Sequence, residues 1–256
     1  MSPEKFALLV ALAVFVGGGV GLFLQRILPE RFTTGGPRDM IGAVVGLLTL
    51  LCALVLGLLI WTAYGVYAGQ NLAVQTVAAK VLQLDLALAD YGPDATPLRA
   101  QIRQSLGKTI DEIWGANETD NDFVAKNFTA AIEGLRNREK ALAELHPTTD
   151  AEKQALGTAS AIVDAIGQAR MQMSFALSNP VSYPLILMVV AWAVFLFVGY
   201  GLMSKGNPMS IVVGAFGAIA VASAVYLILD LSDPYWGSFR ASPAPLEQVL
   251  AVMGKK

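Results

Sequence analysis

The chain has 256 residues, of which 55% are hydrophobic and only 15% charged, and its mean hydropathy is +0.55. This composition is typical of a membrane protein. The formal net charge is −2, and no run of Lys and Arg suited to a phosphate backbone occurs, so nucleic-acid binding is not expected. With one cysteine and one histidine, the chain lacks the residues for a disulfide framework or a Cys/His metal site, and we expect no cofactor and no enzymatic activity.

Four segments are long and apolar enough to cross a bilayer, which requires about 20 residues. They are residues 6–25, 41–67, 183–203 and 209–229, and none of them contains Asp, Glu, Lys or Arg. We therefore expect no proton relay and no voltage-sensing charge inside the membrane. The connections after the first and third segments carry Gly and Pro turn signals, which predict two membrane hairpins.

A polar insertion, residues 68–180, separates the two hairpins and carries ten basic and fourteen acidic residues, hence a net charge of −4. Its periodicity predicts helices, so the expected fold class is all-α. The second span runs without a break to Tyr91, which predicts one long helix that leaves the membrane. We further expect a helix with Thr96 as its N-cap, one over residues 121–145, and one that opens with a capping box at 149–152 and continues into the third span.

Two charged features of the insertion have simple interpretations. Glu118, Asp120 and Asp122 are spaced like part of a calcium loop, but the glycine and the closing glutamate of such a loop are missing. A solvated connection between helices is therefore favoured, and no metal site is expected. Arg170, near the third span, is a candidate ion-pair partner for Asp85 or Asp230.

Several short segments are more distinctive than the hydropathy pattern. They are Asp90-Tyr91-Gly92-Pro93, Ile110-Asp111-Glu112-Ile113-Trp114 and the tail segment Asp233-Pro234-Tyr235-Trp236-Gly237. Together with the long second helix, they resemble the bacterial bestrophin-like membrane proteins over nearly the whole chain. The tail segment resembles the Asp/Asn-Pro-Phe-Gly turn after the last bestrophin span, with Asp233, Pro234, Tyr235 and Gly237 in the matching positions and one additional residue. The acidic run of calcium-gated bestrophins does not follow it, so calcium gating is not expected.

The resemblance implies a homopentameric ion channel whose pore is lined by the second span. It also implies cytosolic termini and a cytosolic insertion in a bacterial inner membrane, a point on which the basic residues of the two sides are nearly balanced. The chain then divides into a first transmembrane helix pair (1–67), a helical cytosolic domain (68–180), a second transmembrane pair (181–231) and a cytosolic C-terminal tail (232–256).

The second span has two contrasting faces when its residues are placed at about 100° each. One is bulky and aliphatic and suits lipid or neighbouring spans: Val44, Leu47, Leu48, Leu51, Val55 and Leu58. The other is small and weakly polar and becomes aromatic near the insertion: Gly42, Gly46, Thr49, Ala53, Leu56, Gly57, Ile60, Tyr64 and Tyr67. The residues by themselves favour close helix packing along this second face, whereas the resemblance favours a pore lined by Thr49, Ala53, Leu56, Ile60 and Tyr64.

Two functions remain open. In an oligomeric channel, rings of Leu56, Ile60 and Tyr64 would form an apolar neck that gates small inorganic ions by dewetting, and the acidic insertion would favour cations at the mouth. In a non-conducting signalling or scaffold protein, the long helices would instead transmit motion between the bilayer and the helical insertion.

Overall fold

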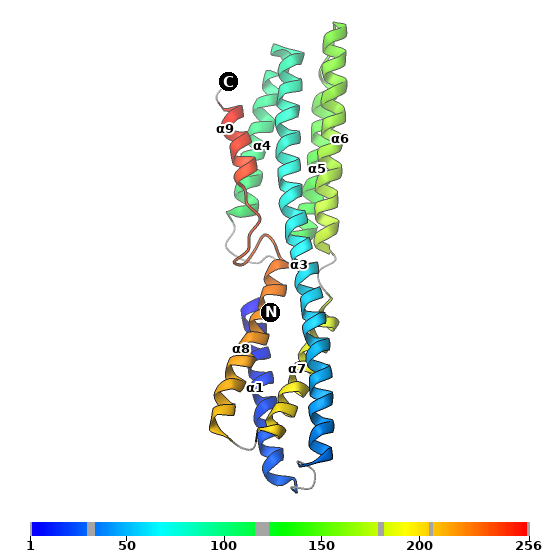
Figure 1. The fold of residues 1–256 in the computed structure, drawn as a ribbon. Helices are drawn as coiled ribbons and strands as arrows, with labels where there is room; N and C mark the ends of the chain where they lie inside the picture. Colours follow the sequence, from blue (N-terminus) through cyan, green and yellow to red (C-terminus); the bar gives the residue numbers. More distant parts are fainter. Residues whose placement is uncertain (1, 30–33, 116–122, 179–181, 205–206, 255–256) are drawn as a thin grey trace. The chain divides into compact units, whose positions relative to one another are not determined.

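The computed structural model describes residues 2–29, 34–115, 123–178, 182–204 and 207–254. Within these ranges all regular structure is helical and no strand occurs, which confirms the all-α prediction (Figure 1). The helices are α1 (Pro3–Ile27), α3 (Gly36–Tyr91), the 3-10 helix η1 (Pro93–Ala95), α4 (Thr96–Trp114), α5 (Phe123–Ala143), α6 (Asp150–Ser178), α7 (Tyr183–Met203), α8 (Pro208–Leu231) and α9 (Ala244–Met253).

The chain divides into two compact units. A membrane unit comprises residues 1–65 and 181–232, and a polar unit comprises residues 66–180 and 233–256. Helix α3 is a single helix of 56 residues, as the unbroken sequence predicts, and it supplies residues to both units. The predicted continuation of the fourth insertion helix into the third span is wrong, because α6 ends at Ser178 and α7 begins anew at Tyr183. Pro184 lies in the first turn of α7, where a residue without an N–H group is tolerated.

The membrane unit contains four helices long and apolar enough to span a bilayer: α1, the first part of α3, α7 and α8. Helix α1 packs closely on α7 and α8. Glycines make the contact with α7 possible, since a Cβ atom on Gly21 would overlap the carbonyl oxygen of Val198, and one on Gly201 would overlap the backbone of Gly18. Small residues therefore bring these two backbones together.

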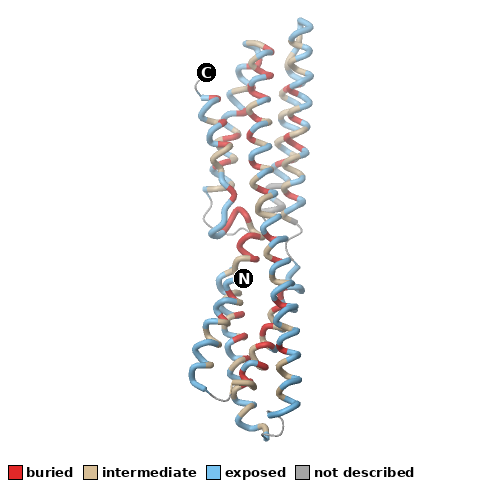
Figure 2. Tube along the Cα trace, in the orientation of Figure 1, coloured by how far each residue is buried: buried red, intermediate tan, exposed pale blue. Residues whose placement is uncertain are grey.

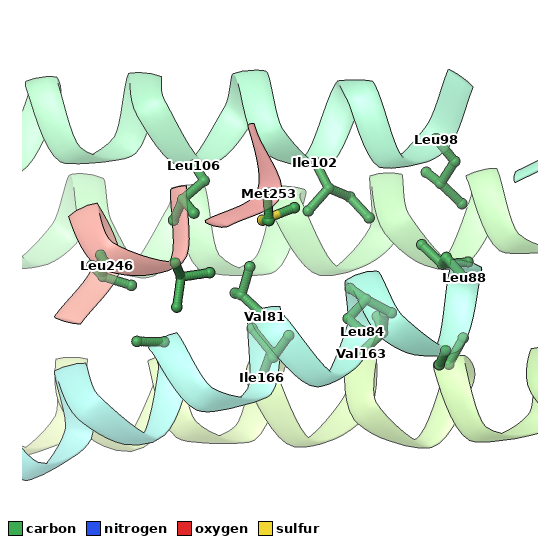
Figure 3. Packing of buried hydrophobic residues seen from close by; sticks show 14 of the residues in the cluster. Val81, Leu84, Leu88, Leu98, Ile102, Leu106, Val163, Ile166, Leu246 and Met253 are labelled. Atoms are coloured by element: carbon green, nitrogen blue, oxygen red, sulfur yellow. The ribbon is translucent and has the colours of Figure 1, made fainter. Parts of the chain in front are cut away.

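The polar unit is a helical bundle around a large apolar core (Figure 3). Helices α3, α4, α6 and α9 each contribute large aliphatic side chains to it, among them Leu84, Ile102, Ile166 and Leu246. One ion pair lies beside this core: Arg99 donates two hydrogen bonds, of 2.7 and 2.9 Å, to the buried carboxylate of Asp85. The bidentate geometry compensates that carboxylate for the loss of water.

The helix starts in the polar unit are close to the predicted ones. The capping box is present, since the Glu152 N–H donates to Thr149 Oγ1 (3.2 Å) and the Thr149 N–H donates to Glu152 Oε2 (3.1 Å). Thr96 is the first residue of α4 and not its N-cap, because η1 brings Ala95 into the capping position. Helix α5 begins at Phe123, two residues later than expected, and ends at Ala143.

Candidate functional site

Helix α3 is largely uncovered within the membrane unit. Only 17% of the residues in its most apolar stretch are buried, against 33% in α7, and the first part of the helix is mostly exposed in Figure 2. The buried residues recur every four or seven positions and form one edge: Val45, Cys52, Leu59 and Ala63. Val45 and Cys52 pack with Leu196 of α7. This edge lies between the two faces expected from the sequence, and no residue of either face is fully buried in the single chain.

The five residues expected to line a pore lie together on one flank of α3. Thr49, Ala53 and Tyr64 are exposed in the single chain, whereas Leu56 and Ile60 are half-buried. The Thr49 hydroxyl donates to the Val45 carbonyl oxygen (2.8 Å) and lies 3.0 Å from the hydroxyl of Tyr200 on α7, which therefore donates to it. This places Thr49 next to the α7 edge, and its hydroxyl is already satisfied by protein groups.

Two of the three glycines on this flank, Gly46 and Gly57, make no packing contact inside the chain. A Cβ atom on Gly46 or Gly57 would meet nothing within 4 Å, and one on Gly42 would meet only the flexible end of Met203, at 3.3 Å. This contrasts with Gly21, whose Cβ would collide with backbone. The packing interpretation of Gly46 and Gly57 therefore has no support within one chain, and their open space is available to another molecule.

The segment after the last span is a tight, buried turn. The Trp236 N–H donates to the Asp233 carbonyl oxygen (3.2 Å), and the Ala241 N–H donates to the Pro234 carbonyl oxygen (2.7 Å). Gly237 has a φ of 92°, a left-handed conformation that favours glycine. Because the turn folds back on itself, the side chains between Asp233 and Gly237 are buried.

Tyr235 ties this turn to α3, and through it to α6. Its hydroxyl donates to Gln70 Oε1 (2.9 Å), and Gln70 Nε2 donates to the Met173 carbonyl oxygen (3.1 Å). Burial raises the pKa of Tyr235, which keeps the phenol protonated as a donor. Trp114 of α4 packs its ring edge-on against Tyr235, with 5.8 Å between ring centroids, and its Nε1 donates to the Ala241 carbonyl oxygen (2.7 Å). The turn is thus an organising contact of the polar unit.

Gln70 was missed by reasoning from the sequence. Its side chain is only 2% exposed, although an amide in the middle of a helix is usually solvated. The run between Tyr67 and Lys80 holds three amides, Gln70, Asn71 and Gln75, and nothing local distinguishes Gln70 among them, because its partners lie more than a hundred positions away.

The architecture agrees with a match to a family of known proteins. The Bestrophin-like domain family matches residues 10–246. The chain belongs to the Bestrophin-like family. Three crystal structures of a bacterial bestrophin homologue from Klebsiella pneumoniae, two of them of point mutants, resemble this Bestrophin-like protein at 14% sequence identity. Their TM-scores are 0.66, 0.65 and 0.62. The three matches cover 100%, 98% and 97% of this chain, and 99%, 99% and 98% of the matched chains, respectively. At this identity the likeness shows a common fold. No curated protein matches the chain.

Two further expectations concern charged residues of this Bestrophin-like protein. The pairing of Arg170 with Asp85 is wrong, because Arg99, which α4 brings beside the core, occupies that carboxylate. Glu118, Asp120 and Asp122 lie outside the described residues. Across the described ranges, no group of three or more His, Cys, Asp or Glu side chains could hold a metal ion.

Proposed function

We propose that this Bestrophin-like protein is an oligomeric ion channel whose pore is lined by Thr49, Ala53, Leu56, Ile60 and Tyr64 of α3. The observation that carries the proposal is the largely uncovered flank of α3, on which Gly46 and Gly57 have open space in place of a packing partner. An uncharged flank of small and weakly polar residues has little to gain from contact with lipid tails. Copies arranged in a ring would cover the bulky faces and leave this flank around a central axis.

The narrowest part of the pore is expected where bulky side chains replace small ones. Leu56, Ile60 and Tyr64 are each one helical turn apart, so in a ring of subunits each of them would form an apolar ring stacked on the next. Rings of this kind gate by dewetting, since a narrow apolar passage excludes water until it widens. No charge lies on the flank, so the neck itself would discriminate weakly between cations and anions.

The pore assignment is tested by ion flux through purified protein in liposomes. Ile60→Ala removes bulk from the neck and is expected to raise the flux several-fold. Leu58→Ala is the matched control, because Leu58 has a similar side chain, is 57% exposed and lies on the face of α3 that points away from the flank. Equal responses to the two substitutions would show that the wrong face of α3 has been assigned to the pore.

The assembly is tested by native mass measurement in mild detergent. We expect a homo-oligomer, and a pentamer on the resemblance to bestrophins. A closed ring without any ion flux would favour the alternative, a non-conducting scaffold in which the 56-residue helix α3 transmits motion. A monomer under all mild conditions would contradict both the ring and the pore.

The expected selectivity follows from the charge of the insertion, and the expected orientation from the resemblance to bestrophins. Its net charge of −4, repeated in each subunit, would concentrate cations at the mouth on that side, an effect that weakens as salt shortens the Debye length from about 10 Å. Reversal potentials measured in asymmetric salt should therefore shift towards the equilibrium potential of the cation, most strongly at low ionic strength.

We place residues 68–180 and both termini on the cytosolic side of a bacterial inner membrane. Labelling of single introduced cysteines in a Cys52→Ser background would check this orientation.

A further inference from the structure

Helices α5 and α6 run side by side in the polar unit and approach closely at a glycine (Figure 1). A Cβ atom on Gly167 of α6 would lie 2.9 Å from the terminal methyl groups of Leu135 on α5, so a larger residue there would require this leucine to move. Gly134 adjoins Leu135 on α5, and Arg170 lies one turn beyond Gly167 on α6. The close approach therefore brings Arg170 to the side of α5 on which Gly134 lies.

A second arginine converges on the same point. Arg138 follows Gly134 by one turn of α5, and a Cβ atom placed on Gly134 would lie 3.4 Å from Nη1 of Arg138 and 3.5 Å from Nη1 of Arg170. Two guanidinium groups from different helices thus approach the same side of α5 at Gly134, where α5 has no side chain of its own. Like charges repel, and the repulsion is strongest where water is excluded; the charge of Arg170 accordingly contributes to the lowered pKa of Arg138.

Within the described part of the chain, neither arginine has a carboxylate at ion-pair distance, since no Asp or Glu oxygen lies within 4.0 Å of a nitrogen of Arg138 or Arg170. Glu112 acts on Arg170 only from a longer range and lies 3.7 Å from Lys108. Burial lowers the pKa of Arg138 to about 10, with a further contribution from the charge of Arg170, and burial also lowers the pKa of Arg170.

We propose that Arg138 and Arg170 form a binding site for a phosphate-class oxyanion between α5 and α6. A guanidinium is a planar fork of N–H donors that matches the oxygens of phosphate in pairs, and two forks facing one space suit a tetrahedral oxyanion. Half-buried arginines are otherwise satisfied by carboxylates, and here a soluble or headgroup anion takes that place. Phosphate can come from solution or from a lipid headgroup, and α6 ends only five residues before the span α7 begins. The proposal does not depend on ion conduction.

Thermal unfolding of the full chain in detergent tests the site with inorganic phosphate as the probe, at an ionic strength held constant with sodium chloride. A ligand that binds only the folded state raises the unfolding midpoint progressively with its concentration. We expect such a rise for the wild type, and at least about tenfold weaker phosphate binding for Arg138→Gln and for Arg170→Gln.

Gly134→Ala is the most specific variant, because its methyl group would lie against both Nη1 atoms, at 3.4 and 3.5 Å, and would restrict the approach of an anion to them, while alanine favours the helix. It should abolish the response to phosphate without loss of stability. Gly157→Ala on α6 is its control, since a Cβ atom there meets nothing within 4 Å, and Arg136→Gln controls for the loss of an exposed charge on α5. Both controls should respond to phosphate like the wild type.

The stability without phosphate separates a ligand site from a structural role. Removing one of two repelling charges should leave the phosphate-free protein as stable as the wild type or more so, whereas loss of a structural arginine would destabilise it.

Thermal unfolding midpoints measured in nanodiscs of phosphatidylglycerol and in nanodiscs of phosphatidylcholine identify whether the bound phosphate comes from a lipid headgroup. A gain with phosphatidylglycerol alone that Arg138→Gln abolishes assigns a lipid headgroup. No response of the wild type to either probe, or equal responses of wild type and Arg138→Gln, would overturn the proposal.

Discussion

Replacing Tyr235 by phenylalanine tests the contact that holds the post-span turn in the polar unit. The change removes one hydroxyl and keeps the ring that packs on Trp114. It leaves Gln70 Oε1 without its donor in a position where the side chain is only 2% exposed. An unsatisfied buried acceptor costs about 1–3 kcal/mol, so we expect the free energy of unfolding to fall by about 2 kcal/mol.

Urea unfolding in mild detergent, followed by tryptophan fluorescence, measures this loss, because Trp114 and Trp236 lie in the same buried cluster as Tyr235. The midpoint should fall while the dependence on urea stays constant. The double variant with Gln70→Leu removes both polar groups, and it should lose less stability than the two single variants combined, by about 1 kcal/mol.

Tyr183→Phe is the matched control, since Tyr183 is 54% exposed, and its loss of a hydroxyl should change the midpoint little. A loss below about 0.5 kcal/mol for Tyr235→Phe, or strictly additive single variants, would refute the argument that this hydrogen bond stabilises the unit.

Three further outcomes follow from the packing and the charges. Asp85→Asn breaks the bidentate pair with Arg99 and should cost about 2–4 kcal/mol in the same assay, somewhat less than a fully buried pair because the Arg99 side chain is 23% exposed. Gly21→Ala forces α1 away from a carbonyl oxygen of α7 and should lower the free energy of unfolding by about 1–3 kcal/mol, measured by thermal unfolding. Gly19→Ala is its control, because a Cβ atom there has open space, and it should change the stability by nothing measurable. Hydrogen bonds from two backbone N–H groups just before α6 hold the pKa of Glu152 below its ordinary value of 4.5. Glu152→Gln should therefore destabilise the protein at neutral pH, and the difference should vanish as the pH falls through the lowered pKa.

The sequence by itself determined the class of the protein and most of its helices. Uninterrupted apolar stretches can satisfy their backbone groups in a bilayer only as helices, so the four candidate spans could be read directly. The run to Tyr91 and the capping box at Thr149 likewise depend on neighbours within a few residues, and the structure has both. The periodic stripe of α4, which includes Leu98 and Ile102, is buried as its spacing predicts.

The tertiary structure decided which polar groups meet, because these partners are distant in the chain. Asp85 is paired with Arg99 and not with Arg170, and Gln70 is satisfied by groups more than a hundred residues away. Helical periodicity predicts which side of a helix is apolar, but it contains no information on whether a neighbour covers that side. The open space at Gly46 and the convergence of two arginines at Gly134 depend on helix positions that only three-dimensional packing fixes.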